Sequence, residues 1–187
     1  MKRYHTHQQG DTIVEVIVAL AVFAMVTASV FAIMQRGSIS AYDSLERSMV
    51  RLRLNSQTEL LTYFRDAYTI ALANHQPIAA GSPADLWQTI VSKSDSTPPT
   101  VADCKPFASY FYIVQNTTTH NYELGTEPYE TAKILPEPGK GLWLYGVRNT
   151  SSVNRKFYDF YAMACWSTTT SQQQTMSSIV RLYDPTP

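Results

Sequence analysis

The stretch HQQGDTIVEVIVALAVFAMVTASV, residues 7–30, decides how this chain is organised, because a polar leader gives way there to an apolar run. Between residues 13 and 34, a span of 22 residues, Glu15 is the only ionisable side chain. A helix of that length extends roughly 33 Å, which is enough to cross a hydrocarbon core of about 30 Å. The stretch therefore predicts a membrane-spanning helix with a carboxylate near its start.

Three interpretations of this segment compete. A secretory signal peptide needs a basic start, a short apolar region and a small-x-small cleavage site, for which 19–21 and 30–32 could serve. The apolar run is longer than such a region, however, and it contains Glu15. A plain single-pass anchor explains the length of the run but not Glu15. The third interpretation explains Gly10 and Glu15 together.

The stretch Gly10-Asp11-Thr12-Ile13-Val14-Glu15 resembles the prepilin signature of type IV pilins and type II secretion pseudopilins. In that family a short basic leader ends in Gly, and the mature chain begins with an apolar helix that has Glu at its fifth position. Residues 1–10 have the length and charge of such a leader, and Glu15 is fifth when counted from Asp11. The family usually has Phe where this chain has Asp11. The resemblance is specific over residues 1–35.

The resemblance implies processing after Gly10 by a prepilin peptidase, with N-methylation of Asp11 left open by the departure from Phe. It also implies that Glu15 pairs with the N-terminal amine of a neighbouring subunit as helices stack in a filament. Such a pair at about 4 Å gains roughly 4 kcal/mol at an effective dielectric near 20, before desolvation is subtracted. The alternative for Glu15 is a carboxylate that snorkels to the membrane edge. The implied partners are the peptidase, a membrane platform protein and other pilin subunits.

Lys2 and Arg3 precede the apolar run, so the positive-inside tendency places the short N-terminus in the cytoplasm and the remainder outside. We expect a single-pass protein of the cytoplasmic membrane that enters a surface filament after assembly. Cys104 and Cys165 lie in the exported part, where one disulfide bridge is the simplest state and two buried free thiols are the alternative. The resemblance implies only that such a bridge would hold the loop before the first predicted strand to the third predicted strand.

The pattern predicts a leader at 1–10, a transmembrane helix half at 11–36, an amphipathic helix half at 37–75 and a head at 76–187. One helix is expected from Thr12 to about Asn74, because proline follows at position 77. Ser82-Pro83-Ala84-Asp85 has the pattern of a helix start, and a short helix through about Ser92 follows. Apolar residues at steps of three and four predict the stripe that faces the core: Tyr42, Leu45, Met49, Leu52, Leu60, Phe64, Tyr68 and Leu72.

The remainder predicts strands, because aromatic and β-branched residues gather at 107–115, 141–148, 156–166 and 177–184. Residues 167–175 are expected to form the loop of a C-terminal hairpin. The expected fold is α+β, with the long helix packed on an antiparallel sheet of about four strands, which is also the pilin architecture. In the third strand, alternation assigns two opposite faces: Tyr158, Phe160, Ala162, Ala164 and Trp166 on one, and Tyr161, Met163 and Cys165 on the other.

The sequence offers no catalytic constellation, metal site or cofactor motif. His75 and His120 lack a second ligand at metal-binding spacing. Glu123, Glu127 and Glu130 surround a glycine, but the alternating spacing of a calcium loop is missing. The formal net charge of zero gives no basic excess that would favour nucleic acid.

The sequence therefore predicts a structural subunit of a type IV pilus or type II secretion-like pseudopilus. A minor subunit is favoured by Asp11 and by the large, loop-rich head. An exposed patch of some of the 12 tyrosines could serve adhesion. The alternative is an uncleaved, single-pass anchored extracellular domain that binds a ligand or acts as an enzyme.

Overall fold

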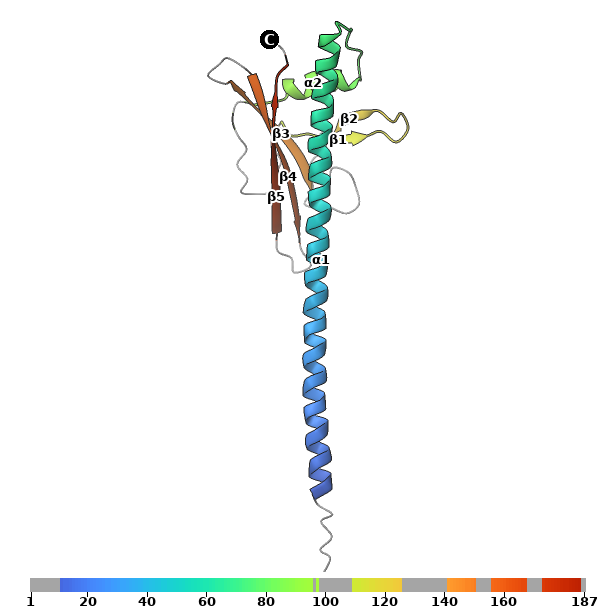
Figure 1. Cartoon of the computed structure of the whole chain (residues 1–187), viewed down its shortest axis with the longest axis vertical. Coiled ribbons are helices and arrows are strands. Elements are labelled where there is room, and N and C mark those ends of the chain that lie inside the picture. The colour runs from blue at the N-terminus through green and yellow to red at the C-terminus, as the bar shows by residue number, and fades with distance from the viewer. Residues whose placement is uncertain are drawn as a thin grey trace, which may run out of the picture. The chain divides into compact units, whose positions relative to one another are not determined.

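The computed structural model describes residues 11–95, 97, 109–125, 141–150, 156–167 and 173–185. Two compact units meet inside the first helix: an N-terminal unit up to Leu45, and a head unit of Glu46–Pro187. The fold is α+β, as predicted. Its helices and strands, in chain order, are α1 (Asp11–Ala73), α2 (Pro83–Ser92), β1 (Tyr112–Gln115), β2 (Tyr122–Gly125), β3 (Leu142–Thr150), β4 (Lys156–Ser167) and β5 (Gln173–Tyr183) (Figure 1).

Helix α1 confirms the predicted long helix to within one residue at each end. It stops in a Schellman motif: the N–H of Gln76 donates to the carbonyl of Ala71 (2.9 Å), and that of His75 to Leu72 (3.1 Å). His75 has a φ of 49° and takes the left-handed position that glycine usually fills. Proline at position 77 cannot continue the helix, which explains why the sequence signal and the observed end agree.

The core-facing stripe was predicted in the wrong phase over its first half. Tyr42, Leu45 and Leu52 are 63 %, 56 % and 68 % exposed, whereas Val50 and Leu54 are buried. A step of two residues turns a helix by about 200°, so Leu52 and Leu54 lie on nearly opposite faces. Periodicity identified an apolar face but could not say which of two faces meets the sheet. The second half is confirmed, since Phe64 and Tyr68 are buried and Leu60 and Leu72 are partly buried against the core.

Helix α2 begins as predicted. The Ser82 Oγ accepts the N–H of Asp85 (3.3 Å), and the Asp85 carboxylate accepts the N–H of Gly81 (2.8 Å). These reciprocal bonds satisfy backbone donors that the first turn leaves free. Trp87 and Ile90 then point into the core, at 1 % and 0 % exposure.

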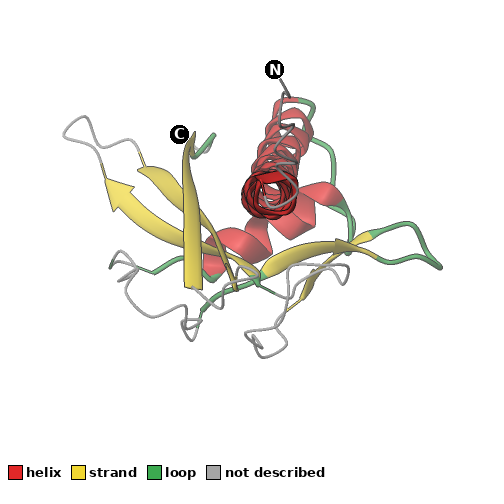
Figure 2. Ribbon diagram, turned by 90° about the horizontal axis from the view of Figure 1, so that it is seen from below, coloured by secondary structure: helices red, strands yellow, loops and turns green. Residues whose placement is uncertain are grey.

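The predicted single sheet of about four strands is two sheets in the described residues. Strands β3, β4 and β5 form an antiparallel sheet in that order, and β1 pairs with β2 in a separate hairpin (Figure 2). Strand β2 was not predicted, and the first predicted strand begins as β1 only at Tyr112, with residues 107 and 108 outside the described part. Phe111 touches the larger sheet through one antiparallel bridge to Leu144.

The side-chain amide of Gln57 on α1 explains how the small hairpin is held. Its Nε2 donates to the carbonyl of Ile113, and its Oε1 accepts the N–H of Ile113, each at 2.9 Å. The amide thus satisfies both backbone groups of one β1 residue, as a neighbouring strand would.

The two faces assigned to the third strand are confirmed on β4. The first face joins the main core with α1 and α2, and the second packs with Trp143 in a smaller cluster on the other side of the sheet. The predicted hairpin loop at 167–175 was too long, because β4 continues to Ser167 and β5 begins at Gln173. Strand pairing overrides the low apolar content of this Thr- and Gln-rich segment.

Gly146 of β3 is required by the packing around it. A Cβ atom there would overlap the Ser94 Oγ and the Phe160 ring. The close approach lets the chain at Asp95 run beside β3, where Asp95 and Val147 form a parallel bridge.

Candidate functional site

The N-terminal site starts where the leader was predicted to end. Helix α1 is described from Asp11 onward, and Glu15 is the fifth of its described residues. The Glu15 side chain is exposed. Gly10 lies outside the described residues, as does the side chain of Asp11, so processing after Gly10 stays a prediction.

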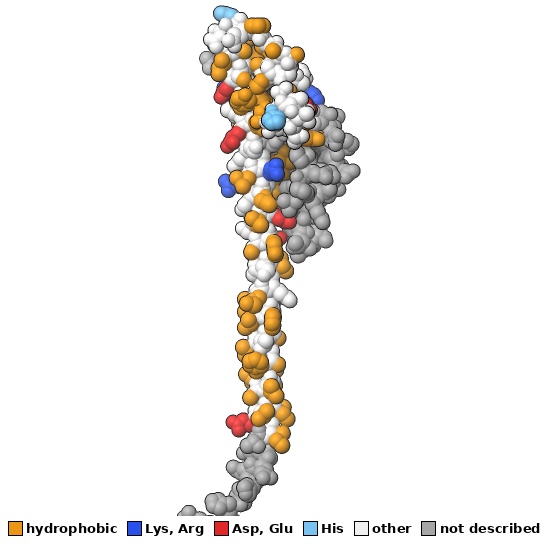
Figure 3. Space-filling view, turned by 90° about the vertical axis from the view of Figure 1, so that its right-hand side faces the viewer, with side chains coloured by type: hydrophobic (Ala, Val, Ile, Leu, Met, Phe, Trp, Pro, Cys, Tyr) orange, Lys and Arg blue, Asp and Glu red, His pale blue; other side chains and the backbone are white. Residues whose placement is uncertain are grey.

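The apolar side chains that follow Glu15 lie on all sides of the helix and are exposed. From Ile13 to Met34 the large hydrophobic side chains are 48–70 % exposed. Figure 3 shows hydrophobic side chains distributed along this part of the helix. The Thr27 and Ser29 hydroxyls donate to the carbonyls of Phe23 and Met25 (2.7 and 2.8 Å), which removes two polar groups from the surface. By length and composition, this is one helix able to cross a membrane.

A second apolar stripe lies on α1 away from the core. Leu52, Tyr63 and Ile70 are 68 %, 50 % and 58 % exposed. They follow one another at 11 and 7 residues, close to whole helical turns, so they share a face. Leu45 precedes Leu52 by seven residues and lies on the same face, while Tyr42 lies about 80° away around the helix. Helix α1 therefore presents apolar side chains beyond its membrane-spanning length.

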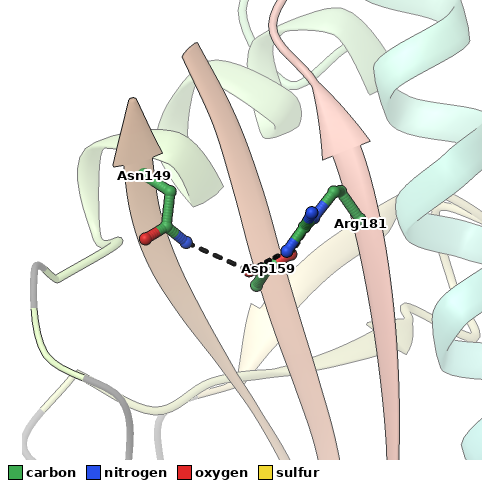
Figure 4. Close-up of polar contacts among 3 residues, drawn as sticks. All are labelled: Asn149, Asp159 and Arg181. Atoms are coloured by element: carbon green, nitrogen blue, oxygen red, sulfur yellow. Dashed lines mark hydrogen bonds and ion pairs between the residues drawn. The ribbon is translucent and has the colours of Figure 1, made fainter. Parts of the chain in front are cut away.

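The head unit contains a polar cluster that the sequence did not reveal. Arg181 on β5 holds Asp159 on β4 with two parallel bonds, from Nε to Oδ1 (2.7 Å) and from its second terminal nitrogen to Oδ2 (2.9 Å). Asn149 on β3 donates to the same Oδ2 at 3.1 Å (Figure 4). One carboxylate thus ties together all three strands of the sheet. Only the strand register, which places Asp159 opposite Arg181, reveals the cluster.

Burial and charge show what this cluster does. Asp159 is 8 % exposed, while the Arg181 side chain is 54 % exposed. The guanidinium also lies 4.3 Å from the centroid of the Phe157 ring, which in turn is 6.0 Å from the ring of Tyr183. The bonds to Asp159 raise the pKa of Arg181 above its usual range. The Asp159 carboxylate accepts bonds from both neighbouring strands, so the cluster fixes the sheet.

Two tyrosines of the head unit, Tyr158 and Tyr145, have raised pKa values. Burial raises the pKa of Tyr158, and the nearby Asp184 carboxylate raises it further. Burial also raises the pKa of Tyr145, whose hydroxyl donates to the Thr97 carbonyl at 3.0 Å. Both hydroxyls are therefore held neutral in the folded head.

The remaining predicted residues are dispersed. Cys165 is buried beside Trp143 and Met163 and is disulfide-bonded; Cys104 lies outside the described residues, so their pairing stays a prediction. His75 and His120 both occupy left-handed turn positions.

Glu123 accepts a bond from the Asn116 amide (2.8 Å), whereas residues 127 and 130 lie outside the described part. Among the residues that the structure describes, no group of three or more His, Cys, Asp or Glu side chains could hold a metal ion.

No family model, no curated protein and no solved structure matches this chain.

Proposed function

We propose that the chain is a minor structural subunit of a type IV pilus or a type II secretion-like pseudopilus. A prepilin peptidase would cleave it after Gly10, and it would assemble through α1 with other pilin subunits on a membrane platform protein. The observation that carries the proposal is Gly10 with Glu15 five positions later, near the start of a long apolar helix whose large hydrophobic side chains are exposed.

The surface of α1 supports assembly through the helix. Within the described residues, the large hydrophobic side chains between residues 13 and 34 are exposed, and lipid or other helices would cover them. The exposed Tyr42, Leu45 and Leu52 extend this apolar surface toward the head. In the membrane, residues 13–34 would contact lipid tails. In a filament, these residues together with Tyr42, Leu45 and Leu52 would contact neighbouring helices.

Glu15 would supply the register of assembly. An ionised carboxylate inside the hydrocarbon costs a few kcal/mol, so a partner of opposite charge is strongly favoured there. Cleavage would create such a charge, the new ammonium of Asp11. Within one chain that amine lies one helical turn away, and in a stack of helices a neighbour's amine can reach Glu15. Pairing between chains would select the stagger at which two helices pack.

The test compares Glu15→Val and Glu15→Gln with Val14→Ala, each in the full chain expressed in its own cells. We expect both Glu15 variants to be cleaved but to enter filaments at least tenfold less than wild type, while Val14→Ala assembles normally. Intact mass and N-terminal sequence measure processing, and the amount in sheared filaments measures assembly.

Normal assembly of Glu15→Val would remove the pairing mechanism. A chain that still begins at Met1 in the wild type would instead favour the uncleaved, membrane-anchored binding or enzymatic domain. A chain that begins near residue 33 would mean a secreted soluble domain.

A further inference from the structure

The outer edge of β3 is covered by other segments of the same chain. Leu144 exchanges both backbone bonds with Phe111, at 3.0 and 2.6 Å. The Gly146 carbonyl accepts the N–H of Asp95 (2.9 Å), and the Arg148 N–H donates to the Asp95 carbonyl (2.7 Å). One edge of the three-stranded sheet is thus satisfied from residue 144 to residue 148.

The opposite edge of the sheet is β5. One hydrogen bond shows which of its residues bond to β4 and which direct their backbone groups outward. The N–H of Asp184 donates to the carbonyl of Lys156 at 3.0 Å. These residues stand opposite each other, one step beyond the Phe157–Tyr183 pair. In an antiparallel pair, hydrogen-bonded positions alternate with positions whose backbone groups point away. Even-numbered residues of β5 therefore bond to β4, and odd-numbered residues direct their N–H and C=O groups outward.

Within the described residues, the outward N–H and C=O groups of β5 form a long edge to which another strand could hydrogen-bond. Within the described residues, no hydrogen bond reaches the backbone of Thr175, Ser177 or Ile179 from the side away from β4. Strand β5 spans 11 residues, roughly 37 Å at about 3.4 Å per residue. It contains no proline, lysine or glycine, and its single charge, Arg181, is held by Asp159.

Natural proteins block long edges of this kind, because an unpaired edge recruits other strands. The β3 edge of this sheet is covered in that way, whereas β5 has no proline or lysine, and its one charged residue, Arg181, is paired with Asp159. We propose that the β5 edge accepts an extended strand from a partner protein, which becomes the fourth strand of the sheet.

The side chains of β5 define the chemistry of that strand. On the core side, Met176 and Val180 are only partly buried, so alternate residues of the incoming strand would be apolar there. On the other side, Ile179 and Tyr183 are 60 % and 52 % exposed. Cross-strand pairing at those positions favours β-branched or aromatic residues. A proline-free segment with apolar residues on both faces is the expected donor.

A separate protein fits better than a second copy of this chain, a choice that rests on the membrane anchoring in the proposed function. Within the head unit, β5 and the part of α1 beyond Glu46 run in the same direction (Figure 1). Antiparallel pairing of two β5 edges would therefore reverse one α1 relative to the other. In the filament of the proposed function all α1 helices run in one direction, which excludes that arrangement.

The first test reads the edge in the isolated protein. Amide hydrogen exchange of the full chain in detergent should show alternation along β5: fast exchange at Ser177 and Ile179, slow exchange at Ser178 and Val180. Equal, slow exchange at odd and even positions would mean that the edge is already covered, and would overturn the proposal.

The second test uses matched proline variants in the full chain. Proline at Ser177 removes an outward N–H, which edge strands tolerate, whereas proline at Ser178 removes an N–H that faces β4. Ser177→Pro should unfold at nearly the wild-type temperature and Ser178→Pro at a clearly lower one. The opposite order would overturn the assigned phase.

The third test finds the donor in the native cells, with p-benzoylphenylalanine replacing Ile179. Irradiation should link the chain to one extended segment of a different protein, and Ser177→Pro should reduce the adduct at least tenfold. No adduct, an adduct between two copies of this chain, or an adduct unaffected by Ser177→Pro would each overturn the proposal.

The mass of the chain in the same cells separates the two proposals. If the chain starts at Asp11 and gives no adduct, the edge proposal alone fails. If it starts at Met1 and gives the expected adduct, processing alone fails.

Discussion

Removing either partner of the Asp159–Arg181 pair should destabilise the head unit by unequal amounts. Arg181→Ala leaves the Asp159 side chain, which is 12 % exposed, with only the Asn149 amide as a donor. Uncompensated buried charges cost about 3–5 kcal/mol, and the partial exposure of Arg181 places this case near 3 kcal/mol. Asp159→Ala instead leaves a guanidinium that is 54 % exposed and that water can solvate. Its cost should be about 1–2 kcal/mol.

Tryptophan fluorescence during urea unfolding of the full chain measures this difference. The three tryptophans, Trp87, Trp143 and Trp166, are all in the head unit and are 1 %, 1 % and 7 % exposed, so the signal reports that unit alone. The double variant should lose less than the sum of the two single variants, because the pair acts as a unit. Equal losses, or a larger loss for Asp159→Ala than for Arg181→Ala, would refute the reasoning from burial.

Three further variants test other contacts of the head. Gln57→Leu leaves both backbone groups of Ile113 without their partner, so the free energy of unfolding should fall by about 2–3 kcal/mol. A fall below about 0.5 kcal/mol for the same variant would show that the amide does not hold the hairpin. Gly146→Ala forces a methyl group against the Phe160 ring and should cost about 1–3 kcal/mol in the same urea titration, with no loss expected if the neighbours can move aside freely. Because the folded state raises the pKa of Tyr158, its stability contribution is complete below about pH 10 and is lost as pH rises above that value. Tyr158→Phe should therefore reduce the fall in stability above about pH 10, and an unchanged slope there would contradict this.

Local signals determined a large part of this protein from sequence alone. The extent of α1 follows from a run without helix breakers that ends before a proline, and the start of α2 follows from Ser82 and Asp85. The two faces of β4 follow from simple alternation. The placement of Glu15 near the start of α1 also follows from the sequence, because the apolar run begins two residues before it. Each of these features depends on residues within a few positions of one another.

The tertiary structure alone decided the features that depend on distant parts of the chain. Apolar residues lie on two faces of α1, and only contact with the sheet selects Val50 and Leu54 over Leu45 and Leu52 as core residues. The register of β4 and β5 brings Asp159 to Arg181, and the pairing of separate segments covers one sheet edge, whereas no described segment pairs with the outer edge of β5. Helical and strand periods define which residues share a face. They carry no information about which face finds a partner, because that is settled by the burial of surface between segments far apart in the sequence.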